Sequence, residues 1–574
     1  MLKIWHLQPP APKEFINRFP EFDPLVLQLL YNRGVTSQEK IDEFFNPDYG
    51  QDLFDPFLLS DMEKACDRIE QAVLKKERVA IFGDYDADGV TSSVILTDFL
   101  KNVLGLSGQV YIPDRQSEGY GLNKKALDWL LYKKIKLVIT CDCGVSNKEE
   151  IDYGKSKGFD FIVLDHHHLH QKFSDDYIII NPKKSGDKYP FKELAACGVV
   201  FKFIQAFLQA KNPHTKNFGV GVEKWLLDLV AIGTVADCVP LISENRTLVK
   251  YGLTVLSKTK RIGLAKLMEK AGIQPENLDT YALSFLIAPR INAAGRIDHA
   301  TTAYKLLATK NTGEAEKISQ DLEEKNYHRQ KLCDEIILEA KEIIGKVKKE
   351  RRILWAAKEK WPLGILGLAA GKICEEFSRP VFILSKGEKE STGSVRSIPQ
   401  FNIIEAITKS ADLLLEYGGH KQAAGLSLEN KNLEIFFDRL EDLAAKQLSD
   451  LDLIPTINVD APLDFSKLDF KFYEELQKLE PHGLGNPKPI FAATSIKVEN
   501  IQLVGYDHQH LKIFLSKPLG GQRKVYEAIG FNQAQGVFQK INKGDLVDIV
   551  FELNANIWNG QRKLELKVLD FKKH

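Results

Sequence analysis

Between residues 77 and 239 the chain alternates short apolar runs with stretches of helical periodicity. The runs are VAIF (79–82), VYI (110–112), LVIT (137–140), FIVL (161–164) and YIII (177–180). Strands separated by helical crossovers pair in parallel, and the helices then cover both faces of the sheet. We therefore predict an α/β fold on a parallel sheet, with any ligand at the carboxyl ends of its strands.

The rest of the chain divides into further predicted segments. Residues 1–50 form an N-terminal helical segment, and the sheet lies in a catalytic domain over 51–310, whose last part is helical with a break at Pro289. A charged, Pro-free stretch over 311–350 predicts one long connecting helix. Residues 351–455 predict a smaller α/β domain, with strands at 352–355 and 380–384 and helices over 364–377 and 402–416.

Residues 456–574 change pattern again, to short strands punctuated by Gly, Asn and Pro, which favours an all-β barrel of the OB-fold kind. This end of the chain is basic. Residues 484–574 hold 13 Lys+Arg against 8 Asp+Glu, a net charge of +5, whereas the first 483 residues hold 65 against 70. The zero net charge of the whole chain therefore hides a basic, aromatic-bearing domain suited to single-stranded nucleic acid.

Several classes of protein are excluded by what the sequence lacks. No apolar run approaches the roughly 18 residues that span a bilayer, and the N-terminus shows no secretory signal pattern. Seven cysteines without a CxxC pair indicate neither a disulfide framework nor a structural zinc site. We therefore predict a cytoplasmic protein without a membrane partner.

The strongest chemical signal is the acidic turn that follows VAIF, with Asp84, Asp86 and Asp88 within five residues. Carboxylates this close repel one another unless a cation or a proton lies between them. An acidic surface turn is the plainer interpretation. An EF-hand loop is a second alternative, but its twelfth position falls on Ile95, where calcium binding needs a glutamate.

Two more strands end in similar groups. LVIT is followed by Asp142, and FIVL by Asp165, His166 and His167; a helical stretch ends near Asp237. Any one such residue is usually structural, but together they favour a metal site. Carboxylates with imidazole suit Mn²⁺ or Mg²⁺, whereas Cys141 and Cys143 more often pack behind the sheet. The set Asp86, Asp88, Asp142, His166 and Asp237 suffices for two ions, which clamp both oxygens of an in-line phosphoryl displacement.

In this order and spacing, GDYDADGVTSS, CDCG, LDHHH and TVADCVPL resemble the motifs of the DHH phosphoesterase superfamily, and GGHKQAAG (418–425) resembles its DHHA1 accessory domain. PDRQSEGYGLN, APRINAAGR, NYHRQ, WPLGILGLAAGK, GSVRS and EPHGLGNPKPIF resemble the bacterial RecJ-type single-strand-specific exonucleases within it. The resemblance runs from about residue 50 to the end. One departure is Phe82, where some relatives carry a histidine that would add a metal ligand.

The resemblance implies roles for particular residues. The ions are held at Asp86, Asp88, Asp142, His166 and Asp237, while Asp84, Asp165 and His167 complete the catalytic site as outer ligands, orienting groups or acids. Arg115, Ser394 and Arg396 recognise a 5′-terminal phosphate. The remaining substrate-binding positions are Tyr120, Arg290, Asn292, Arg296, Gly419 and His420. A surface salt bridge is the usual role of any single arginine, and Tyr120 could either stack on a base or pack in the core.

The implied activity is a 5′→3′ exonuclease that releases mononucleotides from single-stranded DNA with two Mn²⁺ or Mg²⁺ ions, in recombination and repair. The implied partners are single-strand-binding protein and a RecQ-type helicase, with a monomeric enzyme. One alternative is a DHH hydrolase of short oligonucleotides, cyclic dinucleotides or pyrophosphate, but such proteins lack a C-terminal β-domain. Another is a non-enzymatic scaffold like the degenerate relative bound to the eukaryotic replicative helicase, which has lost carboxylates that this chain retains.

Overall fold

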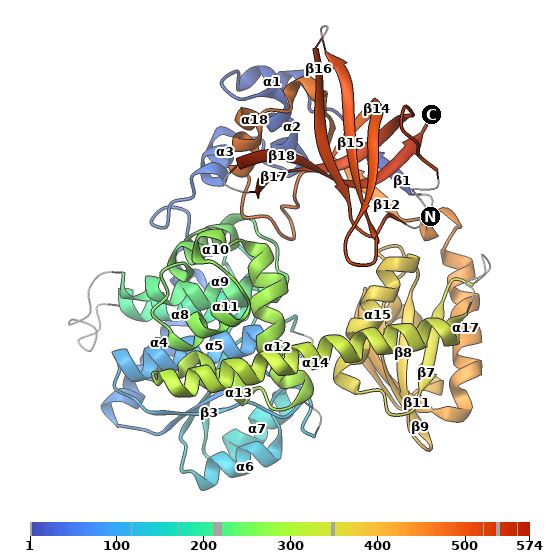
Figure 1. Cartoon of the computed structure of the whole chain (residues 1–574). Helices are drawn as coiled ribbons and strands as arrows, with labels where there is room; N and C mark the ends of the chain where they lie inside the picture. The colour runs from blue at the N-terminus through green and yellow to red at the C-terminus, as the bar shows by residue number, and fades with distance from the viewer. Residues whose placement is uncertain are drawn as a thin grey trace. The chain divides into compact units, whose positions relative to one another are not determined.

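The computed structural model describes residues 3–115, 117–169, 171–210, 221–345, 351–519, 522–534, 540–558 and 561–574. The chain forms two compact units (Figure 1). One unit is Tyr49–Leu453, and the other combines Met1–Asp48 with Ile454–His574. Among the described residues, no helix has both the length and the apolar character needed to cross a membrane.

The first sheet of the larger unit is parallel throughout, as predicted, in the order β3-β2-β4-β5-β6. Its strands are β2 (Val79–Gly83), β3 (Gly108–Tyr111), β4 (Leu137–Cys141), β5 (Asp160–Leu164) and β6 (Ile178–Ile180). Side chains alternate between its faces, so Ile81 joins one apolar core and Phe82 another. Helices cover both cores: α4 (Met62–Leu74), α5 (Ala87–Asp98) and α8 (Ala196–Gln209) on one side, α6 (Lys124–Tyr132) and α7 (Lys148–Ser156) on the other.

The helices that follow extend the first core and lead into the connecting helix. Pro289 lies in the first turn of α12, directly after a π-helical turn over Ala282–Ile287, where a missing N–H costs little. Asn311 caps α14 by accepting the amide of Glu314, and α14 runs unbroken for 33 residues. The predicted end of this helix, at 346–350, lies outside the described residues. The helices are α9 (Leu227–Ala236), α10 (Ser243–Leu256), α11 (Ile262–Lys270), α12 (Ala288–Ile297), α13 (Thr301–Ala308) and α14 (Thr312–Ile344).

A second sheet follows α14, in the order β10-β11-β9-β8-β7, and only β7 and β8 are parallel. The helix predicted over 402–416 is wrong at its end. It stops at Thr408, and the segment from Glu416 pairs with β11, because Gly418 and Gly419 favour an extended hairpin over a helix. The elements are β7 (Leu354–Lys358), α15 (Leu363–Phe377), β8 (Val381–Lys386), β9 (Glu390–Arg396), α16 (Ile403–Thr408), β10 (Glu416–His420), β11 (Ala423–Glu429) and α17 (Leu433–Gln447).

The smaller unit is built on a five-stranded barrel, closed by pairing of β14 with β17, which confirms the OB-like fold. The prediction of short strands is wrong, because the strands have 9 to 14 residues. β-bulges such as that between Val498 and Asn500 bend the strands without ending them. They are β14 (Phe491–Val504), β15 (His510–Leu519), β16 (Gln522–Gly530), β17 (Leu546–Trp558) and β18 (Gln561–Lys573), preceded by β13 (Ala461–Pro462) and α18 (Phe470–Gln477).

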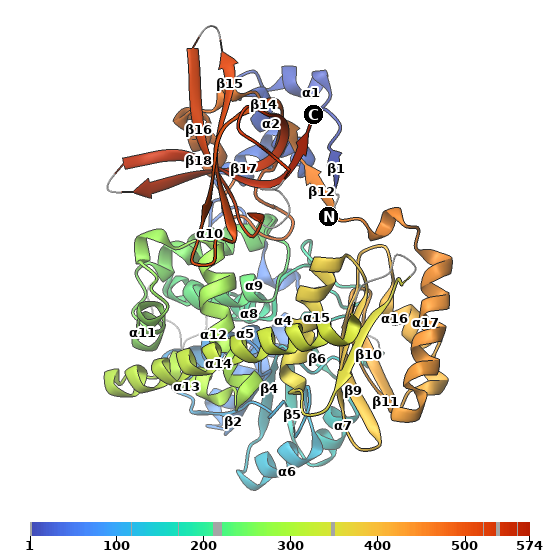
Figure 2. The ribbon, with the colours of Figure 1, turned by 45° about the vertical axis from the view of Figure 1, so that its right-hand side comes forward.

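The N-terminal segment is helical, as expected, but it shares the core of this barrel (Figure 2). Its strand β1 (Ile4–Leu7) pairs in parallel with β12 (Thr456–Val459), and α1 (Lys13–Arg18), α2 (Pro24–Asn32) and α3 (Gln38–Phe45) follow. Arg33 links the N-terminal segment to the loop that precedes the barrel. Its guanidinium donates to Asn486 Oδ1 at 2.7 Å and to the carbonyl of Pro487 at 2.6 Å.

Candidate metal centre and active site

The acidic residues predicted from the sequence meet at the carboxyl ends of β2, β4 and β5, which are neighbours in the sheet. Asp84 and Asp86 follow β2, Asp142 follows β4, and His166 lies two residues after β5. Asp237 arrives from another direction, as the residue that ends α9. The parallel topology therefore gathers side chains up to 82 positions apart in sequence, from Asp84 to His166, at one edge, and α9 adds Asp237.

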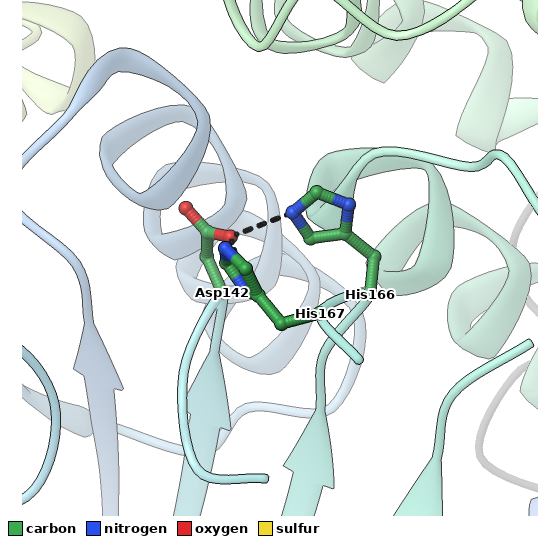
Figure 3. Close-up of side chains that lie close together, drawn as sticks. All are labelled: Asp142, His166 and His167. Carbon is green, nitrogen blue, oxygen red and sulfur yellow. Dashed lines mark ion pairs between the residues drawn. The ribbon is translucent and has the colours of Figure 1, made fainter. Parts of the chain in front are cut away.

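Three overlapping groups of these side chains are spaced as metal ligands. In each group the candidate ligand atoms all lie within 4.8 Å of one another. Asp142 belongs to two groups, and its Oδ1 lies 3.3 Å from His166 Nε2 (Figure 3). The same His166 Nε2 lies 3.5 Å from Asp237 Oδ2. The groups are Asp84–Asp86–Asp142, Asp88–His166–Asp237 and Asp142–His166–His167.

Several of these ligand atoms are buried without a hydrogen-bond partner anywhere in the described part of the chain. They are Asp84 Oδ1, Asp142 Oδ1 and both ring nitrogens of His166. A buried polar atom left unpaired costs about 1–3 kcal/mol, and more when charged. The side chains of Asp84, Asp142 and His166 thus lie close together with acceptor atoms that lack hydrogen bonds. A bound cation would interact with all three at once.

The electrostatics of the cluster agree with this interpretation. Burial and then the negative charge of neighbouring aspartates raise the pKa of Asp84, Asp142 and Asp237 well above the usual value, and the pKa of Asp88 to about 6. Burial, followed by repulsion from His167, lowers the pKa of His166 to about 3. The His166 imidazole is therefore neutral at physiological pH, the form that binds a metal.

The pKa values of Asp165 and His167 are shifted in the opposite direction to those of the neighbouring aspartates and of His166. Burial alone would raise the pKa of Asp165, but the hydrogen bond from His167 and the charge of that imidazole lower it to about 2. Burial likewise opposes protonation of His167, yet its bond to Asp165, Nδ1 to Oδ1 at 2.9 Å, raises its pKa to about 9. Asp165 also accepts the backbone amides of His166, His167 and Val145. It therefore orients the histidine segment and favours the protonated form of His167.

These shifts predict how the stability of the metal-free protein depends on pH. A carboxylate whose pKa is raised in the folded state, such as Asp88, contributes stability at low pH that is lost as the pH rises through about 6. Bound Mn²⁺ would compensate the same charges. We expect the melting temperature in Mn²⁺ to exceed that in EDTA by a margin that widens between about pH 5 and pH 8. Calorimetric scans that run parallel across this range would contradict the prediction.

Two supports of the cluster were not visible in the sequence. Asp88 accepts the amides of Ala196 and Cys197, at 2.7 and 3.0 Å, where α8 begins. Asn292 Oδ1 accepts the amide of Ala87 at 2.8 Å, so this predicted substrate-binding residue holds the start of α5 in place. Both supports join segments more than 100 residues apart, which no local pattern could indicate.

Gly233 on α9 makes room for Asp88. A Cβ at this position would lie 2.6 Å from Cys197 Sγ and 2.7 Å from Asp88 Oδ1. We expect Gly233→Ala to destabilise the protein by about 1–3 kcal/mol despite the better helix propensity of alanine, and to reduce the thermal shift on adding Mn²⁺. Gly371→Ala is the matched control, because its Cβ would meet nothing closer than 3.9 Å. Equal melting temperatures for the two variants would contradict the prediction.

Tyr120 lies inside the site. Its hydroxyl donates to the carbonyl of Asp142 at 2.8 Å, and its ring meets that of His167 edge-on at 5.8 Å. The two cysteines beside Asp142 are buried and belong to the apolar cores. Phe82 stacks on Tyr111 in the core at 5.2 Å.

Four arginines form a group of like charge in the same unit: Arg115, Arg296, Arg329 and Arg396. Burial and then Arg115 and Arg329 lower the pKa of Arg296 to about 10, and burial with Arg115 lowers that of Arg396. Within the described residues, no carboxylate forms an ion pair with any of the four. Arg329, which was not among the residues predicted from the sequence, lies in the NYHRQ segment on α14. Three of the guanidinium groups donate to neutral oxygens of Gly364, Asn326 and Val395. A concentration of guanidinium groups without ion-pair partners suits an anion such as phosphate.

The other predicted substrate-binding residues are placed differently. Arg290 forms an ion pair with Glu323 of α14, to which it donates two hydrogen bonds, and it also donates to the carbonyl of Leu286. Ser394 lies two residues before Arg396 on β9, which puts both on one face of the strand. Gly419 and His420 lie on the exposed strand β10, where Gly419 has a φ of 148° and a Cβ would meet Ala423 O at 2.4 Å.

Sequence models of three domain families match the chain in this order: the DHH family N-terminal domain over residues 78–234, the DHHA1 domain over 350–446 and the RecJ OB domain over 459–570. The fold and the carboxylate–histidine site thus define a phosphoesterase of the DHH class.

Relatives narrow this class. The chain is 31% identical to the single-stranded-DNA-specific exonuclease RecJ of Escherichia coli (strain K12), across 95% of each chain. It is 35% identical to that of Bacillus subtilis (strain 168), across 95% of this chain and 68% of the relative. The crystal structure of RecJ in complex with Mn²⁺ from Thermus thermophilus superposes with a TM-score of 0.83 at 28% identity, covering 100% of this chain and 80% of that one. The protein belongs to the RecJ family.

Proposed function

We propose that this protein is a metal-dependent exonuclease that degrades single-stranded DNA from the 5′ end and releases 5′-mononucleotides. The observation that carries the proposal is the cluster of unsatisfied carboxylate and imidazole atoms at the edge of the sheet. The group of unpaired arginines in the same unit and the family membership support it. RecJ of Thermus thermophilus has been crystallised with Mn²⁺ and with Mg²⁺, and we propose the same ions here.

The residues present fit two ions. Asp84, Asp86 and Asp142 would hold one, and Asp88, His166 and Asp237 the other, with Asp142 between them because His166 Nε2 approaches its Oδ1. When bound, such ions lower the pKa of water and neutralise charge that develops on phosphate. Asp84 would thereby be a direct ligand, where the resemblance implied an outer ligand, an orienting group or an acid.

The remaining residues of the chain would bind and orient the strand. Arg115, Arg296, Arg329 and Arg396 supply charge for the terminal phosphate, which fixes the 5′ end at the site and makes cleavage start there. His167, protonated through Asp165, can donate a proton to the leaving 3′ oxygen. Arg290, paired with Glu323, would shape the site without contacting the phosphate.

The cellular setting completes the proposal. The enzyme would act as a cytoplasmic monomer in DNA recombination and repair, with single-strand-binding protein and a RecQ-type helicase as partners. The catalytic domain would span residues 51–310, the connecting helix 311–350 and the accessory domain 351–455. The OB-like domain, 456–574, would retain the strand.

The test compares substrates labelled at either end. Protein is incubated with single-stranded and duplex DNA in Mn²⁺, Mg²⁺ or EDTA, beside Asp88→Ala. The expected result is release of labelled mononucleotide from the 5′ end of single strands only, absent in EDTA and in the variant. Digestion from the 3′ end, equal cutting of duplex or activity in EDTA would each reject the proposal.

A further inference from the structure

The smaller unit contains a cavity of about 680 Å³ that the proposed chemistry does not use. Its walls come from both ends of the chain: β1 and the end of α2, β12, the loop over 485–490, and the barrel at β18 and just after β16. The volume is in the range of sites that enclose a small molecule or one nucleotide. The loop belongs to the EPHGLGNPKPIF segment, for which the sequence suggested no role.

The lining carries an excess of positive charge. Four cations face one carboxylate, Asp460, which is paired with Arg33 at 3.3 Å, and Lys567 is paired with Glu552 at 3.2 Å. The ammonium groups of Lys3 and Lys488 donate to neutral oxygens, Leu569 O at 3.1 Å and Asn554 Oδ1 at 2.5 Å. No carboxylate forms an ion pair with either lysine in the described part of the chain. The cavity therefore favours an anionic ligand.

One further side chain in the lining suits a planar ring. Phe531 is 50% exposed, although it lies in a cavity wall, and it contacts His510 edge to face at 5.2 Å. Gln533, also in the lining, is fixed by its amide nitrogen, which donates to Val568 O and Leu569 O at 2.9 and 3.2 Å. An exposed aromatic ring in a cationic cavity suits a nucleobase that is linked to phosphate.

We propose that this cavity binds one nucleotide of a single-stranded nucleic acid. The base stacks on Phe531, and Lys3 and Lys488 contact the adjoining phosphates. The N-terminal segment is then part of the strand-binding surface, since β1 supplies Lys3. This inference rests on the proposed function in one respect: the ligand is taken to be the strand that the enzyme degrades.

Binding is measured on the full chain in EDTA, where cleavage does not occur, by anisotropy of a fluorescein-labelled oligothymidylate. Stacking of one base on an aromatic ring predicts about 5- to 100-fold weaker binding for Phe531→Ala. A smaller loss is expected for Lys488→Gln, with a weaker dependence on salt. Tyr132→Ala removes another exposed aromatic ring, on α6, and should bind as the wild type does. Melting temperatures establish that each variant is folded.

Photocrosslinking locates the strand independently. An oligonucleotide carrying 5-iodouracil is irradiated with the wild-type protein, and the crosslinked peptides are identified by mass spectrometry. A crosslink at Phe531 is expected. Crosslinks confined to other segments, together with unchanged affinity of Phe531→Ala, would overturn the proposal. An acidic peptide that binds in a Phe531-dependent manner, while the oligonucleotide does not, would overturn it in favour of a protein ligand.

The nuclease assay separates this inference from the proposed function. Phe531-dependent binding without any Mn²⁺-dependent cleavage would retain the cavity and reject the exonuclease. Cleavage of single strands with no effect of Phe531→Ala on binding would retain the exonuclease and reject the cavity.

Discussion

Asp142→Asn is expected to lower the rate of cleavage by about a thousandfold or more, and at the same time to make the metal-free protein more stable. The loss of activity follows from the position of Asp142, which belongs to two of the three ligand groups. Changes outside the ligand sphere of a metal typically cost about 10- to 100-fold, so loss of a shared ligand should cost more. Cleavage of single-stranded DNA under saturating Mn²⁺ measures it.

The gain in stability has a separate origin in the same residue. Burial and then the charges of Asp88 and Asp86 raise the pKa of Asp142, so its ionised form is disfavoured in the metal-free fold. Asparagine keeps the shape and removes the charge, which should stabilise the protein in EDTA by about 1–3 kcal/mol near neutral pH. In Mn²⁺ the order should reverse. A variant that is less stable than the wild type in EDTA would show that Asp142 has a structural role instead.

The second large effect concerns the 5′ end of the substrate. Arg396 has no ion-pair partner in the described residues, and Gly367 lets it lie against α15, where a Cβ would be 3.0 Å from Nη2. A hydrogen bond between charged groups is worth about 1.5–3 kcal/mol. We expect Arg396→Gln to raise the KM for 5′-phosphorylated strands by about 10- to 100-fold and to remove any preference over 5′-hydroxyl strands.

Arg290→Gln is the informative comparison. This arginine is already paired with Glu323, so its loss should lower stability and leave the ratio between the two substrates unchanged. A full set of initial rates on both substrates distinguishes the variants. If Arg396→Gln kept the wild-type ratio, or if Arg290→Gln abolished it, the assignment of the phosphate site to the arginine group would be wrong.

The gathering of the candidate metal ligands at one sheet edge was predictable because most of them follow strands. Asp84, Asp142 and His166 each come just after an apolar run, and parallel pairing places the ends of such runs together. Asp237 was harder to place from pattern alone, since it ends a helix and not a strand. The proposed ligand role of Asp84 required the distances, because spacing in sequence does not say which neighbouring carboxylates face one another.

What the sequence could not supply was long-range pairing. The partner of Arg290 lies 33 residues away on another helix, and that contact is why we propose a supporting role for Arg290 in place of phosphate binding. Likewise, nothing local links Arg33 to Asn486, or β1 to β12, so the N-terminal segment looked independent of the barrel whose apolar core it shares. The helix predicted over 402–416 extended too far, because the apolar spacing continues beyond Thr408. The glycines at 418 and 419 favour a hairpin there.

The central claim is that two divalent ions bind at the carboxyl edge of the β3-β2-β4-β5-β6 sheet. Anomalous diffraction from crystals soaked in Mn²⁺ tests it most directly. The account predicts two peaks about 4 Å apart, one beside Asp84 and Asp86, the other beside His166 and Asp237, with Asp142 between them. Mn²⁺ peaks elsewhere in the molecule, with none at this edge, would contradict it.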